Sequence, residues 1–349
     1  MEDMKNTAAQ TADTETPLDK NVRLMSPTQM LLRRFFRSKL SIIGLIMVIG
    51  LFAFCFLGPL VYTQWGETQL DKSGKTEYAT SITTYTVDGV TYTVHQTTET
   101  HLADNFLSAP SAAHPLGTDD QGYDVLARLM YGGRVSLLVS FMTVLLLTIF
   151  GVIMGGIAGY FGGWMDNVIM RICDVLMCLP GIPILLILSS AMDGWVSQDW
   201  IEEEMRIYIL MLFLTFISWP GVARLVRGQI LSLREQEFMV AAEAMGYSTG
   251  RKIFKHLVPN VMPQLIVQMS LSLGSMILYE ATLSYLNMGI KAPYTAWGSM
   301  INIITTNSDI LQHHLYVWVP AGVCIVIAVL GFNFVGDGLR DALDPKARR

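Results

Sequence analysis

"LSIIGLIMVIGLFAFCFLGPLVY", residues 40–62, contains no charged side chain and decides the class of the fold. A run of about 20 apolar residues is long enough to cross the hydrocarbon core of a bilayer as one helix. A cleaved signal peptide fits poorly, because a long tail precedes the run, its apolar core exceeds about 15 residues and no small-residue cleavage site follows. We therefore predict an uncleaved membrane span.

Further apolar runs of similar length follow along the chain. The sequence predicts six spans, at residues 40–62, 134–160, 168–191, 205–227, 264–288 and 315–336. The composition agrees, since 52% of the residues are hydrophobic and 15% are charged, against about 25% charged in soluble domains. The third run is interrupted by Pro180, Gly181 and Pro183, which membrane helices tolerate when neighbouring groups satisfy the backbone. The expected fold is an all-α membrane protein with six transmembrane helices.

The distribution of Lys and Arg indicates how these spans are oriented. With the N-terminus inside, 6 of the 24 basic residues fall outside and the remaining 18 (24 − 6) fall inside. Because inner loops of membrane proteins carry an excess of Lys and Arg, we expect both termini in the cytoplasm. The basic stretch at residues 30–39 is then either a positive flank of the first span or a helix lying on the inner membrane surface.

These spans divide the chain into segments. We expect a cytoplasmic tail and basic flank at 1–39, the first transmembrane helix at 40–62, an extracytoplasmic insert at 63–133, a core permease domain with five transmembrane helices at 134–338, a cytoplasmic loop within that core at 228–262, and a cytoplasmic C-terminal tail at 339–349.

The insert contains one clear element of local structure. "TTYTVDGVTYTVH", residues 83–95, alternates polar and apolar residues on either side of Asp88-Gly89. A type I′ turn needs positive φ at both central positions, which Asp-Gly supplies, so the stretch predicts a β-hairpin. A lone hairpin is marginal in water. It is therefore either a spacer or a structure that packs on the rest of the insert or on a partner.

Polar residues inside the predicted spans are candidates for function or for helix packing. Asp174 has Arg171 one turn earlier, which favours an intrahelical ion pair. Glu280 has no local partner, and ionisable groups in a membrane are costly, so it either hydrogen-bonds another helix or belongs to a translocation path. Ser272 and Ser275 are candidate lining residues of the same path.

"EFMVAAEAMGYSTGRKIFKHLVPNVMPQ", residues 237–264, is a basic interruption between the fourth and fifth spans. One helical face carries Phe238, Ala241, Ala242 and Met245. Gly246 suits the left-handed position after a helix, and Ser248 suits the cap of a second helix. The second helix carries a stripe of Ile253, Phe254, Leu257 and Val258. Pro259 and Pro263 are expected to end or kink it. This helix pair either docks on a cytoplasmic partner or packs only beneath its own bundle.

The same residues resemble the EAA loop of ABC importer permeases. "AAEAMG" at 241–246 and "HLVP" at 256–259 follow the pattern, although Val240 and Val258 replace the usual Glu and Leu. In that family the loop forms a coupling helix that docks on an ATPase subunit. The resemblance implies contacts to the ATPase from Phe238, Ala241, Ala242, Glu243, Met245, Gly246, His256 and Pro259.

Three further stretches resemble the oligopeptide and dipeptide permeases of this family: residues 33–48, 114–141 and 280–301. The resemblance implies import of peptides across a bacterial cytoplasmic membrane. Implied partners are a second, related permease, two ATPase subunits carrying ATP and Mg, an extracytoplasmic peptide-binding protein and membrane lipid. We expect no cofactor on this chain and no nucleic-acid partner.

Other functions remain as alternatives. A permease for nickel or a nickel chelate would share these features, and a channel is the rival class. An enzyme is disfavoured, because the sequence contains no H-E-x-x-H or G-x-S-x-G stretch and no P-loop spacing. His313-His314 is a weak metal candidate, with only Asp309 nearby in the sequence, so we expect no metal site.

Overall fold

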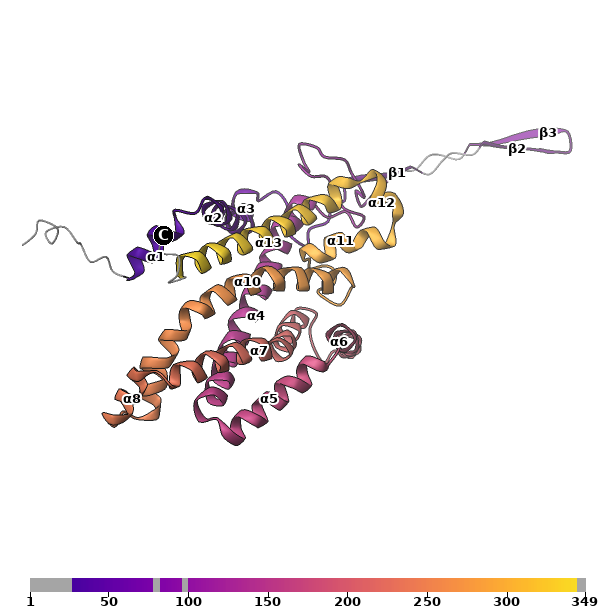
Figure 1. Ribbon diagram of the computed structural model, residues 1–349. Helices are drawn as coiled ribbons and strands as arrows, with labels where there is room; N and C mark the ends of the chain where they lie inside the picture. The colour runs from indigo at the N-terminus through magenta and orange to yellow at the C-terminus, as the bar shows by residue number, and fades with distance from the viewer. Residues whose placement is uncertain (1–26, 78–81, 96–99, 344–349) are drawn as a thin grey trace, which may run out of the picture.

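The computed structural model describes residues 27–77, 82–95 and 100–343, and the predicted tails lie mostly outside these ranges. Helices dominate it (Figure 1). Their bounds are α1 Pro27–Phe35, α2 Lys39–Phe52, α3 Gly58–Val61, α4 Val125–Phe161, α5 Gly163–Cys178, α6 Gly181–Ser197, α7 Met205–Arg234, α8 Glu237–Ala244, α9 Thr249–Arg251, α10 Val258–Tyr285, α11 Trp297–Thr306, α12 Ser308–His313 and α13 Leu315–Leu343. Two π-helical segments, η1 Ala53–Leu57 and η2 Lys252–Leu257, lie within longer helices.

Five helices of the described chain are long and apolar enough to cross a membrane. They are Lys39–Val61, Val125–Phe161, Met205–Arg234, Thr249–Tyr285 and Leu315–Leu343. A sixth span results if α5 and α6 are counted as one. The all-α membrane fold predicted from the sequence is confirmed, with five or six spans.

The third predicted span, 168–191, is interrupted at Pro180, as predicted. The structure has α5 and α6 there, bent by 78° at a break of residues 179–180. Pro180 removes a backbone donor at this break, and Leu179 before it adopts the extended conformation that a following proline favours. The second and fifth helices are longer than predicted, since α4 begins at Val125 and the fifth begins at Thr249.

Small residues allow the long helices to approach one another closely. A Cβ built at Gly155 of α4 would lie 2.3 Å from the Ala223 carbonyl oxygen of α7. A Cβ at Gly338 of α13 would collide with Ser41 of α2. Small side chains at such crossings are typical of membrane helices, where packing rather than water exclusion drives association. These contacts place α4 against α7, and α13 against α2.

The predicted β-hairpin is present. β2 Ile82–Val87 pairs antiparallel with β3 Val90–His95, and Val87 lies opposite Val90. Asp88 and Gly89 have φ of 54° and 79°, which is the left-handed pair that a two-residue turn requires. A second ribbon joins β1 Gly74–Glu77 to β4 Thr100–Ala103.

A compact polar cap covers the N-terminal end of α4; it consists of residues 62–71 and 104–124. His114 is buried at its centre, with Nδ1 2.8 Å from Asp124 Oδ2 and Nε2 3.1 Å from Asp71 Oδ2. Trp65 stacks on the imidazole with ring centroids 4.6 Å apart. Burial would raise the pKa of Asp71, but hydrogen bonds from Asn105, Ser73 and His114 lower it to about 2. The cap is therefore held by buried polar groups that satisfy one another.

Candidate functional site

The element formed by residues 235–259 begins with α8, which ends in a Schellman turn. The Tyr247 N–H donates to the Ala242 carbonyl at 3.1 Å, and the Gly246 N–H donates to the Glu243 carbonyl at 2.9 Å. Gly246 has a φ of +70°, the left-handed conformation predicted for it. The turn satisfies the last carbonyls of α8 and sets the direction of the following helix.

The second helix of the 235–259 element does not end before the fifth span, so Pro259 and Pro263 do not end it, which was one of the two predicted alternatives. It continues from Thr249 to Tyr285 as one helix. The π-helical segment η2 precedes Pro259, and the Val258 N–H donates to the Ile253 carbonyl, five residues back. This wider turn accommodates a residue that has no N–H to donate. Ser248 occupies the cap position of α9, but its side chain makes no capping hydrogen bond.

The apolar residues of α8 are divided between two faces, whereas the sequence predicted one. Met239 is buried in the main hydrophobic cluster, which also contains Leu257, and Ala242 is buried as well. Ala242 is therefore not available for close approach by a partner, contrary to the prediction. Other apolar side chains of the element are exposed: Phe238, Val240, Ala241, Met245 and, from η2, Phe254.

The two helices of the 235–259 element are tied to each other. The Tyr247 ring stacks on His256 with centroids 5.8 Å apart, and the Arg251 guanidinium lies 4.1 Å from the centre of the same ring. Lys252 Nζ lies 3.9 Å from Glu243 Oε1. His256 thus packs from η2 against the turn between the helices, while Pro259 is exposed on the helix that leads into the bundle.

Ion pairs attach α7 to α5 near this element. Arg227 binds Asp166 through two hydrogen bonds of 2.8 and 2.6 Å. Asp174 contacts Arg171, as predicted, at 3.7 Å, but its shorter contact is to Arg224 of α7 at 2.5 Å. Asp174 therefore joins α5 to α7 through Arg224. The predicted ion pair with Arg171 of its own helix is the longer of its two contacts.

A polar stripe runs along one side of α10. Gln264, Gln268, Ser272, Ser275 and Tyr279 recur at intervals of four, four, three and four residues. They line two neighbouring cavities of about 520 and 280 Å³ beside α10, and both cavities include Gln268. The larger is closed by α7 and α13, and the smaller by α7 and α4. The sequence prediction identified Ser272 and Ser275 but missed the two Gln and Tyr279, although their helical spacing was visible.

Other polar positions of α10 face away from these cavities. Ser270 Oγ donates to the Phe332 carbonyl of α13, and Gly274 packs against Asn333. Glu280 is buried and accepts a hydrogen bond of 2.7 Å from Ser284. It also neighbours Ser136 of α4. The structure thus places Glu280 in a helix interface, apart from Ser272 and Ser275.

Family comparisons extend this description. The family described as binding-protein-dependent transport system inner membrane component matches residues 149–349. The N-terminal TM domain of oligopeptide transport permease C matches residues 26–73.

Similar proteins agree with these matches. A dipeptide transport system permease protein DppC of Alkalihalophilus pseudofirmus is 35% identical, over 95% of this chain and 94% of its own length. An oligopeptide transport system permease protein OppC of Bacillus subtilis is 32% identical, over 98% of this chain and 96% of its own length. Among solved structures, an inward-facing form of the MetNI methionine ABC transporter has a TM-score of 0.46 at 19% identity, covering 62% of this chain and 96% of that chain.

This chain belongs to the family of binding-protein-dependent transport system inner membrane components. Within that family its first span matches the N-terminal domain of the oligopeptide permease C branch, which confirms the resemblance seen in the sequence. It is a multi-pass membrane protein.

Proposed function

We propose that this chain is the permease subunit of an ABC importer for oligopeptides or dipeptides in a bacterial cytoplasmic membrane. The names of the dipeptide and oligopeptide permeases with which it aligns along nearly its whole length support peptide as the solute. The positive-inside distribution of Lys and Arg supports a cytoplasmic location of both termini and of the 235–259 element.

The observation that carries the proposal is the exposed apolar face of the 235–259 element. Phe238 is 39% and Met245 61% exposed between the fourth and fifth spans, and Phe254, near the start of the fifth, is 76% exposed. Contiguous apolar surface in water marks an interaction site. An ATPase subunit docking here would cover this face and would push on a rigid helix that continues into α10.

The polar stripe of α10 is the proposed lining of the solute path. In a bilayer, polar side chains face a cavity or another helix rather than lipid. A second, related permease would complete the path opposite this stripe. Ser272 and Ser275 then contact the solute path, and Glu280 acts through helix packing. ATP and Mg bind to two ATPase partners, an extracytoplasmic binding protein delivers the peptide, and this chain carries no cofactor.

The test is reconstitution of the complete transporter in liposomes. With ATP inside and the binding protein outside, the complex is expected to accumulate a labelled dipeptide or oligopeptide, and uptake should stop without ATP. Passive equilibration without ATP would indicate a channel. Mass spectrometry of the solute bound to the purified complex identifies the cargo, and a nickel chelate in place of a peptide would refute the peptide assignment.

A further inference from the structure

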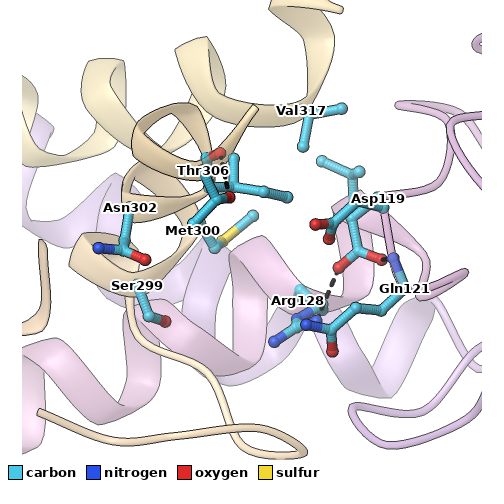
Figure 2. A pocket seen from close by; sticks show the side chains of 11 residues that line it. Asp119, Gln121, Arg128, Ser299, Met300, Asn302, Thr306 and Val317 are labelled. Atoms are coloured by element: carbon cyan, nitrogen blue, oxygen red, sulfur yellow. Dashed lines mark hydrogen bonds and ion pairs between the residues drawn. The ribbon is translucent and has the colours of Figure 1, made fainter. Parts of the chain in front are cut away.

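A small polar pocket lies at the end of the bundle opposite the 235–259 element. Its volume is about 180 Å³, and it lies between the start of α4, the cap segment before it, and α11 with the start of α13. Figure 2 shows Asp119, Arg128 and Gln121 on one wall and Ser299, Met300, Asn302 and Thr306 on the other. Since a water molecule takes about 30 Å³ of liquid, the space suits one side chain and is too small for a whole peptide.

Two of the three charges around this pocket neutralise each other. Arg128 NH1 donates to Asp119 Oδ2 at 2.6 Å, and both side chains are buried. The other Asp119 oxygen accepts from the backbone N–H groups of Gln121 and Tyr123, each at 2.9 Å. The Asp119–Arg128 pair is therefore a fixed, neutral wall.

Asp120 is the charge that remains. It lines the pocket, is only partly exposed, and forms no ion pair within the described part of the chain. Burial and then the Asp119 charge raise its pKa, and Arg128 and the Asp120 backbone N–H offset this only in part. A carboxylate that is partly removed from water and lacks a cation is costly. A bound cation would relieve that cost.

The remaining lining groups define the shape of such a cation. Asn302 donates its amide N–H to the Tyr285 carbonyl, and Thr306 donates its hydroxyl to the Ile303 carbonyl. One Asn302 N–H and the Thr306 hydroxyl hydrogen are thus used, which leaves the amide and hydroxyl oxygens as acceptors beside the second Asn302 N–H. The rest of the lining consists of the polar Gln121 and Ser299 and of four apolar side chains: Val125, Met300, Ile303 and Val317. The pocket offers acceptors and one negative charge beside an apolar surface.

We propose that this pocket binds a primary alkylammonium or guanidinium head whose methylene stem rests on the apolar lining. Such a group consists of donors only, which matches the free acceptors. It comes either from the solute or from a lysine or arginine of a docking protein. The binding step does not depend on the transport function proposed above.

Direct binding to the full-length chain, purified with its partner subunits in nanodiscs, tests the proposal. The probe is n-butylguanidinium, and n-butanol is the neutral control. Calorimetry is expected to show n-butylguanidinium binding that weakens at least tenfold in Asp120→Asn. The matched control Asp88→Asn removes the same charge from the hairpin turn and is expected to bind like wild type. Equal binding by wild type and Asp120→Asn overturns the proposal.

A footprint locates the bound probe. Carbodiimide with glycine methyl ester labels reactive carboxyl groups, and peptide mass spectrometry reads each site. The probe is expected to reduce labelling of Asp120 at least fivefold and to leave the exposed Asp309 unchanged. Equal protection of both residues, or of neither, refutes the site. Because Asp120→Asn removes an unpaired carboxylate, its melting temperature is expected to equal or exceed that of wild type, so lost binding would not reflect unfolding.

Transport assays distinguish the two sources of the cation. If the solute supplies it, Asp120→Asn lowers uptake of lysine-containing peptides relative to N-acetylated neutral ones. If a docking protein supplies it, the same variant raises the concentration of binding protein needed to stimulate ATP hydrolysis, equally for all solutes. If Asp120→Asn and the control Asp88→Asn both lost transport of every solute, this would count against the proposed transport function. The binding measured by calorimetry would remain valid in that case.

Discussion

The polar cap and the 235–259 element lie at opposite ends of α10 and α4 and are stabilised in opposite ways. The cap buries polar groups that satisfy one another: His114 between Asp71 and Asp124, and Arg128 against Asp119. The 235–259 element keeps its few polar contacts at the turn and exposes apolar side chains such as Val240 and Phe254.

This contrast distinguishes a region whose buried groups find their partners within the chain from a region that leaves apolar side chains uncovered. Buried charged groups are stable only when each has its partner, and the cap supplies those partners itself. Exposed apolar surface outside a membrane gains free energy only when another surface covers it. Substitutions in the cap should therefore change the stability of the isolated chain, whereas substitutions on the exposed face of the element should change only its interactions.

The largest expected effect is the loss of coupling to ATP hydrolysis when residues of the 235–259 element are substituted. Gly246→Val places a β-branched residue at a φ of +70°, which costs on the order of 1 kcal/mol or more and misdirects the second helix. We expect loss of solute-stimulated ATP hydrolysis in liposomes, although the variant inserts and pairs with the other permease. Ala241→Trp adds bulk to the exposed face and is expected to abolish co-purification of the ATPase.

The matched control for the glycine is Gly250→Val, which makes the same change in α9. Gly250 has open space around its Cβ position and no positive φ. It should retain most of the coupling. If Gly246→Val and Ala241→Trp both kept full coupling, the 235–259 element would be only a loop beneath its own bundle.

The next largest expected effect is a loss of thermal stability when a buried residue of the polar cap is substituted. His114→Ala removes the group that lies between two buried carboxylates and leaves Asp71 and Asp124 facing each other without it. A buried polar group that loses its hydrogen-bond partner costs about 1–3 kcal/mol, more when that group is charged. Thermal unfolding of the isolated chain in detergent should show the loss. His313→Ala is the control, because His313 is exposed and pairs only with the exposed Asp309. Equal melting of the two variants would show that the cap is not held by His114.

The sequence predicted different parts of the molecule for different physical reasons. Uncharged runs such as residues 40–62 locate spans because length and hydropathy suffice for that purpose. The Asp88-Gly89 turn and Gly246 were predicted correctly, since each needs a backbone conformation that few residues adopt. These features depend on local chemistry alone.

Other features depend on tertiary contacts that no local pattern contains. The burial of Ala242 follows from the position of α8 against the bundle, although Ala241 beside it has the same chemistry. The pairing of Asp174 with Arg224 joins two helices. The buried His114 cluster joins residues 71, 114 and 124, which no local pattern brings together. The predicted contacts of the 235–259 element with an ATPase stay predictions.

Substitution of Glu280 is expected to have a smaller effect. Like the polar groups of the cap, Glu280 is buried and hydrogen-bonded, but it lies within a span. Glu280→Gln keeps an acceptor for Ser284 and should transport like wild type. Glu280→Ala leaves the buried Ser284 hydroxyl without that acceptor and opens a cavity, so it should lower stability by about 1–3 kcal/mol. Melting temperature and uptake of a cationic peptide are the measurements. Impaired uptake in the Gln variant with unchanged melting would place the Glu280 charge on the solute path instead.

The smallest effect is expected for the β2–β3 hairpin, which belongs to the same insert as the cap but contributes no partner to its buried charges. Its two strands hydrogen-bond to each other, and Val87 and Val90 beside the turn are more than half exposed. Deleting residues 80–98 should therefore leave the melting temperature of the isolated chain unchanged, in contrast to His114→Ala. Uptake then distinguishes the two interpretations of the hairpin. Normal uptake identifies it as a spacer, whereas lost uptake at normal membrane abundance identifies it as a contact for the binding protein or the solute. A lower melting temperature would contradict the comparison, because it would show that the cap depends on the hairpin and is not complete within its own residues.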